Sequence, residues 1–365
     1  MEPRTVNIQE LKKLFEQWYK VRLQDIEELK EIKRQIDQCI KRTIFLNEEV
    51  SDEYVMICYG HAVITSDSSK IIDSLQNEIM ENESRLKDQL KYYFLFFQAS
   101  YCFDKYKFQE ALELFKRAER YLYAVSWSAE EAEYNYKLAG LYYSLDKYLV
   151  SINCVNKARK LFQEVGNQMR RLAACDTIYG LNCCELRQYE EAEEHYYDAL
   201  EYAQKTNYTL LIMQIYHNLG LMYAQQNMSA AAILWLSKAA KYGENHHKTY
   251  FLLCREHFKI NHVKEGLEAF NKGVALCEAS GSKADLQRFS MLYAFYCERD
   301  TEAFEKKYHE GIDFFIKEKL WHRVKEYSIE LAHYYTHHSN YKKAVRYYEL
   351  YIESEQNILE GEILK

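Results

Sequence analysis

Small and bulky apolar residues recur at fixed offsets along most of this chain. In one stretch, Gly180 is followed twelve positions later by Ala192, sixteen later by Tyr196 and nineteen later by Ala199. Such offsets place small residues where two neighbouring helices approach closely, and they place a bulky residue in the gap that the small ones open. The pattern therefore predicts a hairpin of two packed helices.

The same spacing returns in several other stretches. Further units begin at Ala99, Gly220, Cys254 and Ala332; a unit from Gly140 lacks one residue, and a degenerate unit runs from Met291 to Gly311. Repeated helical pairs of this kind are typical of tetratricopeptide arrays, in which each hairpin stacks on the next. We therefore expect an all-α fold with about seven tetratricopeptide-like hairpins in a right-handed superhelix over residues 89–365. The alternative is an irregular helical bundle.

The first 66 residues lack the repeat and carry apolar residues at helical spacing instead. Asp25 and Glu28 resemble a capping box at the start of the second of three expected helices. The apolar stripes of the three helices are Leu11, Leu14, Phe15 and Trp18, then Ile26, Leu29, Ile36 and Ile40, then Tyr54, Ile57 and His61. We expect a three-helix module over residues 1–66, a linker region over 67–88 and the repeat domain over 89–365.

Composition supports helices and argues against several functions. Pro occurs once and Gly eleven times in 365 residues, whereas average usage would give roughly 18 and 25. The net charge of −7 and the lack of a dominant basic run count against direct nucleic-acid binding. The N-terminus has no apolar signal core, and the apolar run from Tyr92 to Phe103 is too short to span a bilayer. We expect a cytoplasmic protein without membrane contact, whose ten cysteines are reduced thiols.

Sequence motifs of known catalytic or metal sites are scarce. The chain has neither a phosphate-binding glycine loop nor a G-x-S-x-G motif. His333 and His337 lie four residues apart, as metal ligands on a helix would, but the glutamate of an H-E-x-x-H motif does not accompany them. Solvated or core-edge histidines are the favoured interpretation, and we expect neither a metal nor another cofactor.

The repeat frame also predicts which residues face a ligand groove. In such a unit the second, fifth, sixth and ninth positions of the first helix face inward, and in the unit of Gly220 these are Gln214, His217, Asn218 and Leu221. An inward asparagine suits an extended peptide, because its amide offers one peptide unit both a donor and an acceptor. The alternative is a groove filled only with solvent.

With the three-helix module, the linker and the array laid out, the chain resembles the Rap family over essentially its full length. These proteins are response-regulator aspartate phosphatases and peptide-pheromone receptors of Bacillus-type bacteria. The stretches that carry the resemblance are FEQWYK (15–20), LKYYFLFFQASY (90–101), LNCCELRQYEEA (181–192), YHNLGLMYAQ (216–225) and ELAHYYTHHSNYKKA (330–344). Their order and spacing together carry the match.

The resemblance implies a cytoplasmic quorum-sensing regulator of processes such as sporulation or competence. Its N-terminal module would bind a response regulator, which can carry Mg, through Asn47, Glu48 and Tyr54. Its repeats would bind an imported signalling peptide of about five residues, which switches the protein off. Family residues that hold the peptide correspond to Asn182, Glu185 and Asn218, and the carboxylate of Glu185 would suit a basic side chain on the peptide.

One departure from the family bears on catalysis. Family phosphatases carry a Glu-Glu-Asp-Gln run near the break between the second and third helices, and its glutamine is thought to orient the attacking water. Here the region reads IFLNEEV, residues 44–50, without a glutamine. Asn47 could position water through its amide, whereas the anion of Glu48 would be repelled by a phosphoryl group. The chain is therefore either a phosphatase that uses Asn47 or a purely steric regulator.

Two other functions come into question for a chain of this pattern. A generic tetratricopeptide scaffold for protein assembly, without pheromone or phosphatase activity, is the main alternative. A transcription factor of the same receptor class would need an N-terminal helix-turn-helix, and residues 1–66 show neither its turn glycine nor a basic recognition helix.

Overall fold

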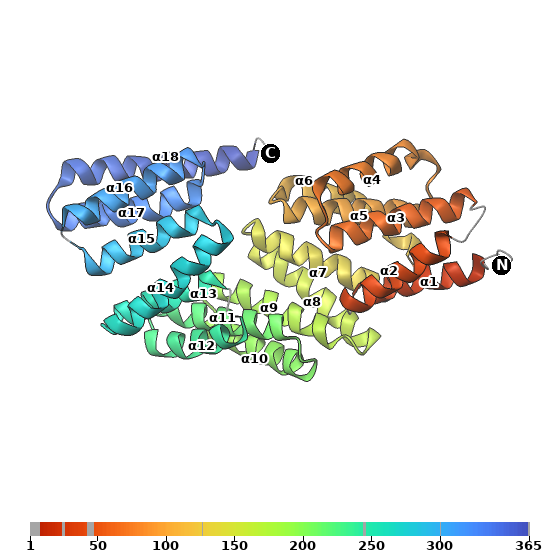
Figure 1. The fold of residues 1–365 in the computed structure, drawn as a ribbon, viewed down its shortest axis with the longest axis horizontal. Coiled ribbons are helices and arrows are strands. Elements are labelled where there is room, and N and C mark those ends of the chain that lie inside the picture. Colours follow the sequence, from red (N-terminus) through yellow and green to blue (C-terminus); the bar gives the residue numbers. More distant parts are fainter. Residues whose placement is uncertain are drawn as a thin grey trace. The chain divides into compact units, whose positions relative to one another are not determined.

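The computed structural model describes residues 8–23, 26–41, 47–125, 127–243, 246–299 and 301–363, and every regular element in these ranges is helical (Figure 1). The expected all-α fold is confirmed. Asp25 of the expected capping box and residues 44–46 of the IFLNEEV stretch lie outside the described residues. The chain divides into two compact units, Met1–Tyr208 and Thr209–Lys365.

The first unit holds the N-terminal module and three hairpins. Its helices are α1 Ile8–Val21, α2 Ile26–Lys41, α3 Glu48–Ile64, α4 Ser69–Glu81, α5 Asp88–Asp104, α6 Phe108–Glu119, α7 Ser128–Ser144, α8 Tyr148–Val165, α9 Met169–Glu185 and α10 Tyr189–Lys205, with 3₁₀ turns η1 Glu83–Arg85 and η2 Leu122–Ala124. The hairpins α5/α6, α7/α8 and α9/α10 correspond to the units expected from Ala99, Gly140 and Gly180.

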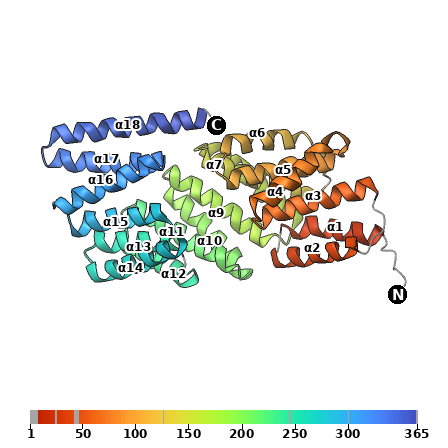
Figure 2. The same ribbon diagram turned by 45° about the horizontal axis from the view of Figure 1, so that its top comes forward.

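The second unit holds four hairpins, which Figures 1 and 2 show as successive pairs running toward the blue C-terminal helix. Its helices are α11 Thr209–Gln225, α12 Ser229–Tyr242, α13 His247–Lys259, α14 Val263–Ser280, α15 Lys283–Cys297, α16 Glu302–Lys317, α17 Trp321–His337 and α18 Tyr341–Ile363. Each pair matches an expected unit, including the degenerate one from Met291 to Gly311. Within the described ranges, seven repeat hairpins are thus present, as the spacing predicts.

The close approach of small and bulky residues explains why these helices pair. A Cβ atom added to Gly180 would lie 2.7 Å from the Tyr196 ring, and one added to Gly220 would lie 2.5 Å from Cγ of Leu236. Both distances are too short for a real side chain, so glycine is needed for each pair of helices to pack as closely as it does. The small and the bulky residue that lie sixteen positions apart in the sequence are therefore in direct contact in the structure.

The segment expected as a linker contains a helix that the repeat pattern missed. Helix α4 packs against α3, and it buries Ile72 and Ile79. The connecting turn places Ser66 in the left-handed region (φ 57°), and the Asp67 N–H donates to the Ala62 carbonyl at 2.9 Å. This is the Schellman-type turn that also ends α5, where Tyr106 has φ 61°. Helices α3 and α4 therefore form an additional hairpin, and residues 67–88 are mostly ordered helix.

The core of the first unit joins the N-terminal module to the first repeats. All six residues from Tyr92 to Phe97 on α5 are buried, because α3, α6 and α7 surround this helix. Trp18 at the end of α1 packs edge-on against Phe97, with ring centroids 6.1 Å apart. Among the described helices, none combines the length and the apolar character needed to cross a membrane.

Candidate functional site

Asn47, the expected catalytic residue, is the N-cap of α3. Its side-chain Oδ1 accepts a hydrogen bond from the Val50 N–H at 2.9 Å, and the residue is exposed. This bond satisfies one of the backbone donors that a helix start leaves open. The amide oxygen is therefore engaged in the cap, and only the Nδ2 group remains to donate a hydrogen bond outward.

Charged pairs surround this helix start. Glu49 lies 3.3 Å from Lys12 Nζ and 2.9 Å from Lys87 Nζ, and these two ammonium groups hold the pKa of Glu49 below its usual range. One turn further, Asp52 accepts two hydrogen bonds from Arg85, at 2.6 and 3.1 Å. Glu48, one of the expected regulator-binding residues, is exposed. The start of α3 is thus a mixed-charge surface fixed to α1 and η1.

Glu53 is a candidate functional group that the sequence did not single out. Burial raises the pKa of its carboxyl to about 7; Lys12 opposes this shift and Glu49 adds to it. At neutral pH the group is therefore partly protonated and can donate a hydrogen bond. Only the three-dimensional packing produces this environment.

Tyr54, the third expected regulator-binding residue, is held between α3 and α2. Its hydroxyl donates to Asp37 Oδ1 at 2.9 Å, and the Lys33 ammonium lies 2.6 Å from the same carboxylate oxygen. Burial, with further contributions from Cys58 and Asp37, raises the pKa of Tyr54 well above its ordinary value. Tyr54 therefore fixes α3 against α2, while part of its ring stays accessible.

Two expected peptide-binding residues lie on α9 in the first unit. Asn182 is fully buried, and its Nδ2 donates to Ser151 Oγ at 2.9 Å and to the Ile178 carbonyl at 2.7 Å, whereas its Oδ1 has no protein donor. In this structure Asn182 links α9 to α8 and exposes none of its surface. Glu185, at the end of α9, is exposed and lies 3.5 Å from the Tyr143 hydroxyl. Partial burial, together with the charge of Asp146, raises its pKa above the ordinary value.

The other four expected peptide-binding residues lie along one face of α11 in the second unit. Gln214 is exposed, His217 and Asn218 are half-buried, and Leu221 packs at the edge of the core. His217 Nδ1 lies 3.0 Å from Thr249 Oγ1 on α13, and burial lowers the pKa of His217 to about 4, with His246 and Lys248 acting in the same direction. Among the described residues, Asn218 has no side-chain hydrogen-bond partner.

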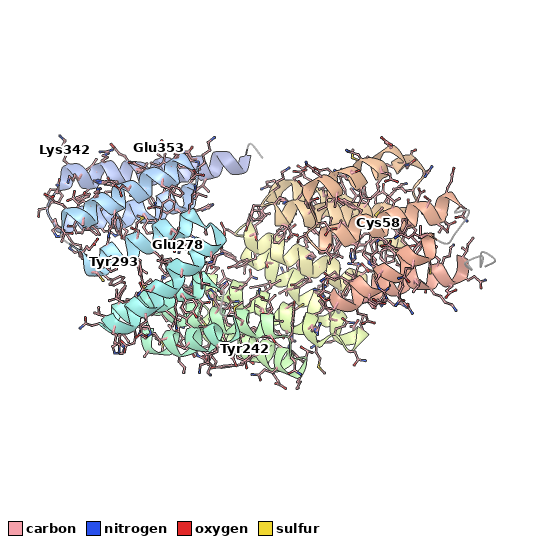
Figure 3. The ribbon with its side chains drawn as sticks, viewed as in Figure 1. Cys58, Tyr242, Glu278, Tyr293, Lys342 and Glu353 are labelled. Carbon is pink, nitrogen blue, oxygen red and sulfur yellow. The ribbon has the colours of Figure 1, made fainter. Side chains whose placement is uncertain are left out.

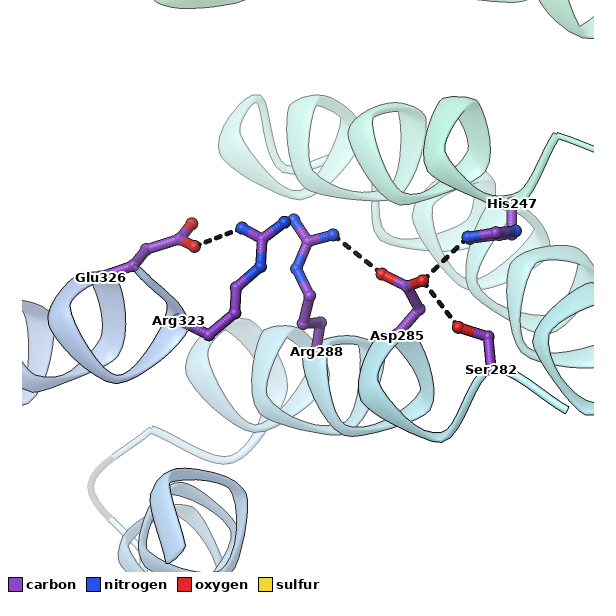
Figure 4. Close-up of polar contacts among 6 residues, drawn as sticks. All are labelled: His247, Ser282, Asp285, Arg288, Arg323 and Glu326. Atoms are coloured by element: carbon purple, nitrogen blue, oxygen red, sulfur yellow. Dashed lines mark hydrogen bonds and ion pairs between the residues drawn. The ribbon is translucent and has the colours of Figure 1, made fainter. Parts of the chain in front are cut away.

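A polar network continues from α13 to α15 in the second unit (Figure 4). His247 Nε2 lies 2.9 Å from Asp285 Oδ2, the Ser282 hydroxyl donates to the same oxygen at 2.8 Å, and Arg288 lies 3.0 Å from Oδ1. Burial alone would raise the pKa of Asp285, but the hydrogen bonds from Ser282 and Arg288 outweigh it and lower the pKa. The repeat frame gave no signal for this network, because its members lie on different hairpins.

One group of side chains has the spacing of metal ligands. Asp176, His195 and Asp198 place one ligand atom each within 4.8 Å of one another. Arg159, however, lies 2.8 Å from Asp176 Oδ1 and 3.6 Å from Asp198, and the guanidinium already supplies a positive charge there. The His333 and His337 pair lies at the exposed end of α17 and is not part of any such group among the described residues.

Comparison with known proteins places these features in a wider context. No family model matches the chain. Regulatory protein RapG of Bacillus subtilis (strain 168) is 26% identical over 365 residues, which cover 97% of this chain and 98% of RapG. Response regulator aspartate phosphatase I of the same strain is 26% identical and covers 97% of this chain and 92% of its own.

The fold has a solved counterpart. The crystal structure of a Rap protein complexed with Competence and Sporulation Factor superposes with a TM-score of 0.80 at 21% identity, and the match covers 96% of this chain and 99% of that one. At this identity the likeness concerns the fold. In sequence and in fold, over nearly its whole length, this chain is thus a relative of the Rap regulatory proteins, which confirms the resemblance seen in its motifs.

Proposed function

We propose that this chain is a cytoplasmic quorum-sensing regulator that binds a bacterial response regulator and is inhibited by a short signalling peptide. The observation that carries the proposal is the extent of the likeness to the Rap proteins: it includes both the N-terminal module and the whole array of hairpins. A scaffold that shared only the repeat would match in the array alone. The crystal structure of a relative with a bound signalling factor supports the peptide part of the proposal.

The α11 face is the proposed peptide contact in the second unit. Asn218 keeps both the donor and the acceptor of its amide available, and Gln214 offers a second, exposed amide four residues earlier. Two amides on one helix face can bind the backbone of an extended peptide without demanding a particular side chain. In the first unit, Glu185 remains the predicted partner of a basic peptide side chain. Asn182 also remains a predicted contact, but its side chain must first break its hydrogen bonds to Ser151 and Ile178 before it can reach a peptide.

The N-terminal module is the proposed site for the response regulator. The start of α3 is accessible at Asn47 and Glu48, and Tyr54 lies two turns further along the same helix. A water that attacks an aspartyl phosphate needs an acceptor for its hydrogens, so that its lone pair points at phosphorus. Residues 44–50 contain no glutamine, and the cap bond already uses one of the two acceptor sites of the Asn47 oxygen and fixes its orientation. We therefore propose that the protein acts mainly by binding the regulator and dephosphorylates it slowly or not at all.

The test is capture of partners from the native cytosol with the full chain as bait, with and without a pool of synthetic pentapeptides. The expected result is that mass spectrometry identifies a response regulator that is released by the pool. Calorimetry with the active pentapeptide should then show binding that Asn218→Ala abolishes, while Asn271→Ala, an exposed asparagine on α14, leaves it intact. Unchanged affinity in Asn218→Ala would remove Asn218 from the site.

A generic scaffold predicts a different outcome. In that case the captured proteins would include no response regulator, and no peptide of the pool would change what is captured. The same experiment therefore separates the two functions.

A further inference from the structure

A small polar cluster lies between three consecutive helices of the first unit. Asp176 on α9 meets His195 and Asp198 on α10, and each of the three can place one ligand atom within 4.8 Å of the others. Arg159 on α8 completes the cluster. Helix α9 packs against both neighbours, and side chains fill the space between the three helices in the yellow-green part of Figure 3. None of these residues is among the proposed contacts of the peptide or the response regulator.

The carboxylate of Asp176 is the most deeply buried charge of the cluster. The residue has no exposed surface, and its Oδ1 lies 3.0 Å from His195 Nδ1 and 2.8 Å from Arg159 Nε. Its second oxygen, Oδ2, is buried without a hydrogen-bond partner among the described residues. Such an oxygen is costly, because it has lost its water and has gained no donor in exchange. Oδ2 is therefore available to a ligand that the cluster can hold.

Arg159 compensates the charge of the cluster only in part. Its Nε is close to Asp176 Oδ1, but this N–H makes no hydrogen bond, because it does not point at the oxygen. Its Nη2 lies 3.6 Å from Asp198 Oδ2, which is beyond ordinary hydrogen-bond distance. Two carboxylates and one guanidinium leave one negative charge over when the imidazole is neutral. A divalent cation in the place of the guanidinium would balance both carboxylates.

The three side chains match a divalent transition-metal ion. An imidazole nitrogen with two carboxylate oxygens is a donor set that Zn²⁺ accepts, whereas Mg²⁺ and Ca²⁺ prefer oxygen alone. Bonds of about 2.0–2.1 Å around a tetrahedral ion place neighbouring ligand atoms about 3.3 Å apart, and His195 Nδ1 already lies 3.0 Å from Asp176 Oδ1. Asp198 follows His195 by three residues and so shares its face of α10. The side chain of Asp198 is 46% exposed and can rotate toward the ion.

Neighbouring side chains hold His195 in place for such a role. Its ring stacks on Tyr179, with ring centroids 3.8 Å apart and 30° between the planes, and the Tyr179 hydroxyl donates to Glu191 at 3.0 Å. An imidazole that is already fixed loses little rotamer freedom when it binds an ion. The side chains of His195 and Arg159 are 19% and 26% exposed, so the cluster reaches the surface. An ion can enter there, and the guanidinium can leave.

We propose that Asp176, His195 and Asp198 form a binding site for a divalent transition-metal ion, with Zn²⁺ as the best fit. Arg159 is the cation that this ion displaces. Without the ion, the guanidinium reduces the repulsion between the two carboxylates; with the ion bound, it turns into solvent. Because the ligands come from both helices of one hairpin, the ion links α9 to α10 and stabilises the first unit. The proposal depends on neither the peptide nor the response regulator.

The test is thermal melting and calorimetry of the full chain, under reducing conditions, with Zn²⁺, Co²⁺ or Mg²⁺ added. Zn²⁺ and Co²⁺ should raise the melting temperature, EDTA should reverse the shift, and Mg²⁺ should have no such effect. Asp198→Asn and His195→Gln should each weaken Zn²⁺ binding by about 10- to 100-fold or more, since even the outer partners of metal ligands contribute that much. Both side chains are partly exposed, so these variants should fold, and circular dichroism checks that they do.

Arg159→Gln separates a metal site from a purely structural ion pair. If Arg159 only holds the helices together, loss of its charge lowers the melting temperature and Zn²⁺ does not restore it. If Arg159 competes with the ion, Arg159→Gln should bind Zn²⁺ about 10-fold more tightly, because the repulsion between the two cations is gone. Saturating Zn²⁺ should then raise the melting temperature of this variant by more than it raises that of the native protein.

The matched control is His333→Gln with His337→Gln, an exposed pair with ligand spacing on α17, and it should bind Zn²⁺ as the native chain does. The spectrum of bound Co²⁺ identifies the donor atoms. A sulfur-to-metal charge-transfer band would assign the ion to cysteine thiolates and overturn the proposal. So would the absence of any Zn²⁺ effect, binding that survives both Asp198→Asn and His195→Gln, or an affinity that Arg159→Gln leaves unchanged.

Discussion

Arg22 and Glu130 form an ion pair in which both side chains are buried, although they lie 108 positions apart. The pair joins the residue after α1 to the first turn of α7, and the Arg22 guanidinium lies 5.4 to 5.5 Å from the ring centres of Tyr93, Phe96 and Phe97. The N-terminal module is therefore attached to the repeats of its unit partly through a desolvated charge. Such a pair adds little net stability to the folded protein. Removing one partner is nevertheless destabilising, because the other charge then stays buried without its ion-pair partner.

The first prediction follows from this asymmetry. Glu130→Ala should lower the free energy of unfolding of the first unit by about 3–5 kcal/mol, because the buried Arg22 guanidinium loses its ion-pair partner. The double variant Arg22→Met with Glu130→Leu should be much closer to the native protein. Urea denaturation measures both. Glu201→Ala, which breaks an exposed pair with Lys205, serves as the control and should change stability little. Equal stability of Glu130→Ala and this control would contradict the prediction.

The second prediction concerns the acid sensitivity of the second unit. The pKa of His217 is about 4 in the folded protein and near 6.5 in its ordinary state. Below pH 6.5, His217 binds a proton in the unfolded chain, whereas in the folded chain it binds one only as the pH approaches 4. The free energy of unfolding therefore decreases as the pH falls from 6.5 to 4. The difference between these two pKa values of His217 corresponds to roughly 3 kcal/mol of unfolding free energy.

Denaturation midpoints measured between pH 7 and pH 4 should therefore fall steeply in the native protein and less steeply in His217→Gln. His322→Gln, at an exposed position on α17, should retain the native slope. The prediction fails if the slope is the same with and without His217.

The third prediction concerns the close contact of α11 with α12. A Cβ atom at position 220 would lie 2.5 Å from Leu236 Cγ and 3.2 Å from the Leu236 backbone nitrogen, so the neighbouring helix cannot yield by a side-chain rotation alone. Gly220→Ala should cost about 1–3 kcal/mol. Gly140→Ala is the matched control, because its Cβ would meet only Ile178 Cδ1 at 3.9 Å. This control should be neutral or stabilising, since alanine favours a helix more than glycine does. Similar thermal shifts in the two variants would refute the argument.

The contrast between these glycines shows what the sequence could predict. The offsets from Gly180 and Gly220 identified real contacts, because in a repeat the spacing along the chain fixes the spacing in space. Helix α4 was missed, since it buries mainly Ile72 and Ile79 and has no repeat signature. The Arg22–Glu130 pair could not be predicted at all, because no local pattern links positions so far apart. Asn182 was expected to contact a peptide, and its burial depends on the neighbouring Ser151, which the pattern treats only as a small residue.

The last prediction separates the two roles of Asn47. Asn47 is the exposed N-cap of α3: its side-chain oxygen accepts a hydrogen bond from the Val50 N–H, and its Nδ2 group is left to donate. Asn47→Ala removes both functions and should lower the stability of the first unit by about 1 kcal/mol. Asn47→Asp keeps a good cap but replaces the donor by an anion, so it should leave the stability of the first unit intact. Ser68→Ala is the control, because Ser68 caps α4 without a side-chain hydrogen bond.

The measurement is phosphate loss from a labelled response regulator with this protein in catalytic amounts, alongside thermal melting of each variant. If the slow activity depends on the amide, both Asn47→Ala and Asn47→Asp should abolish it, and only Asn47→Ala should also lower the melting temperature. Loss of activity in Asn47→Ala alone would mean that the residue acts through the helix start. Rapid turnover that survives Asn47→Asp would place the chemistry elsewhere. Glu53 would then be the first residue to test, because its carboxyl has a pKa of about 7 and can therefore both donate and accept a proton near neutral pH.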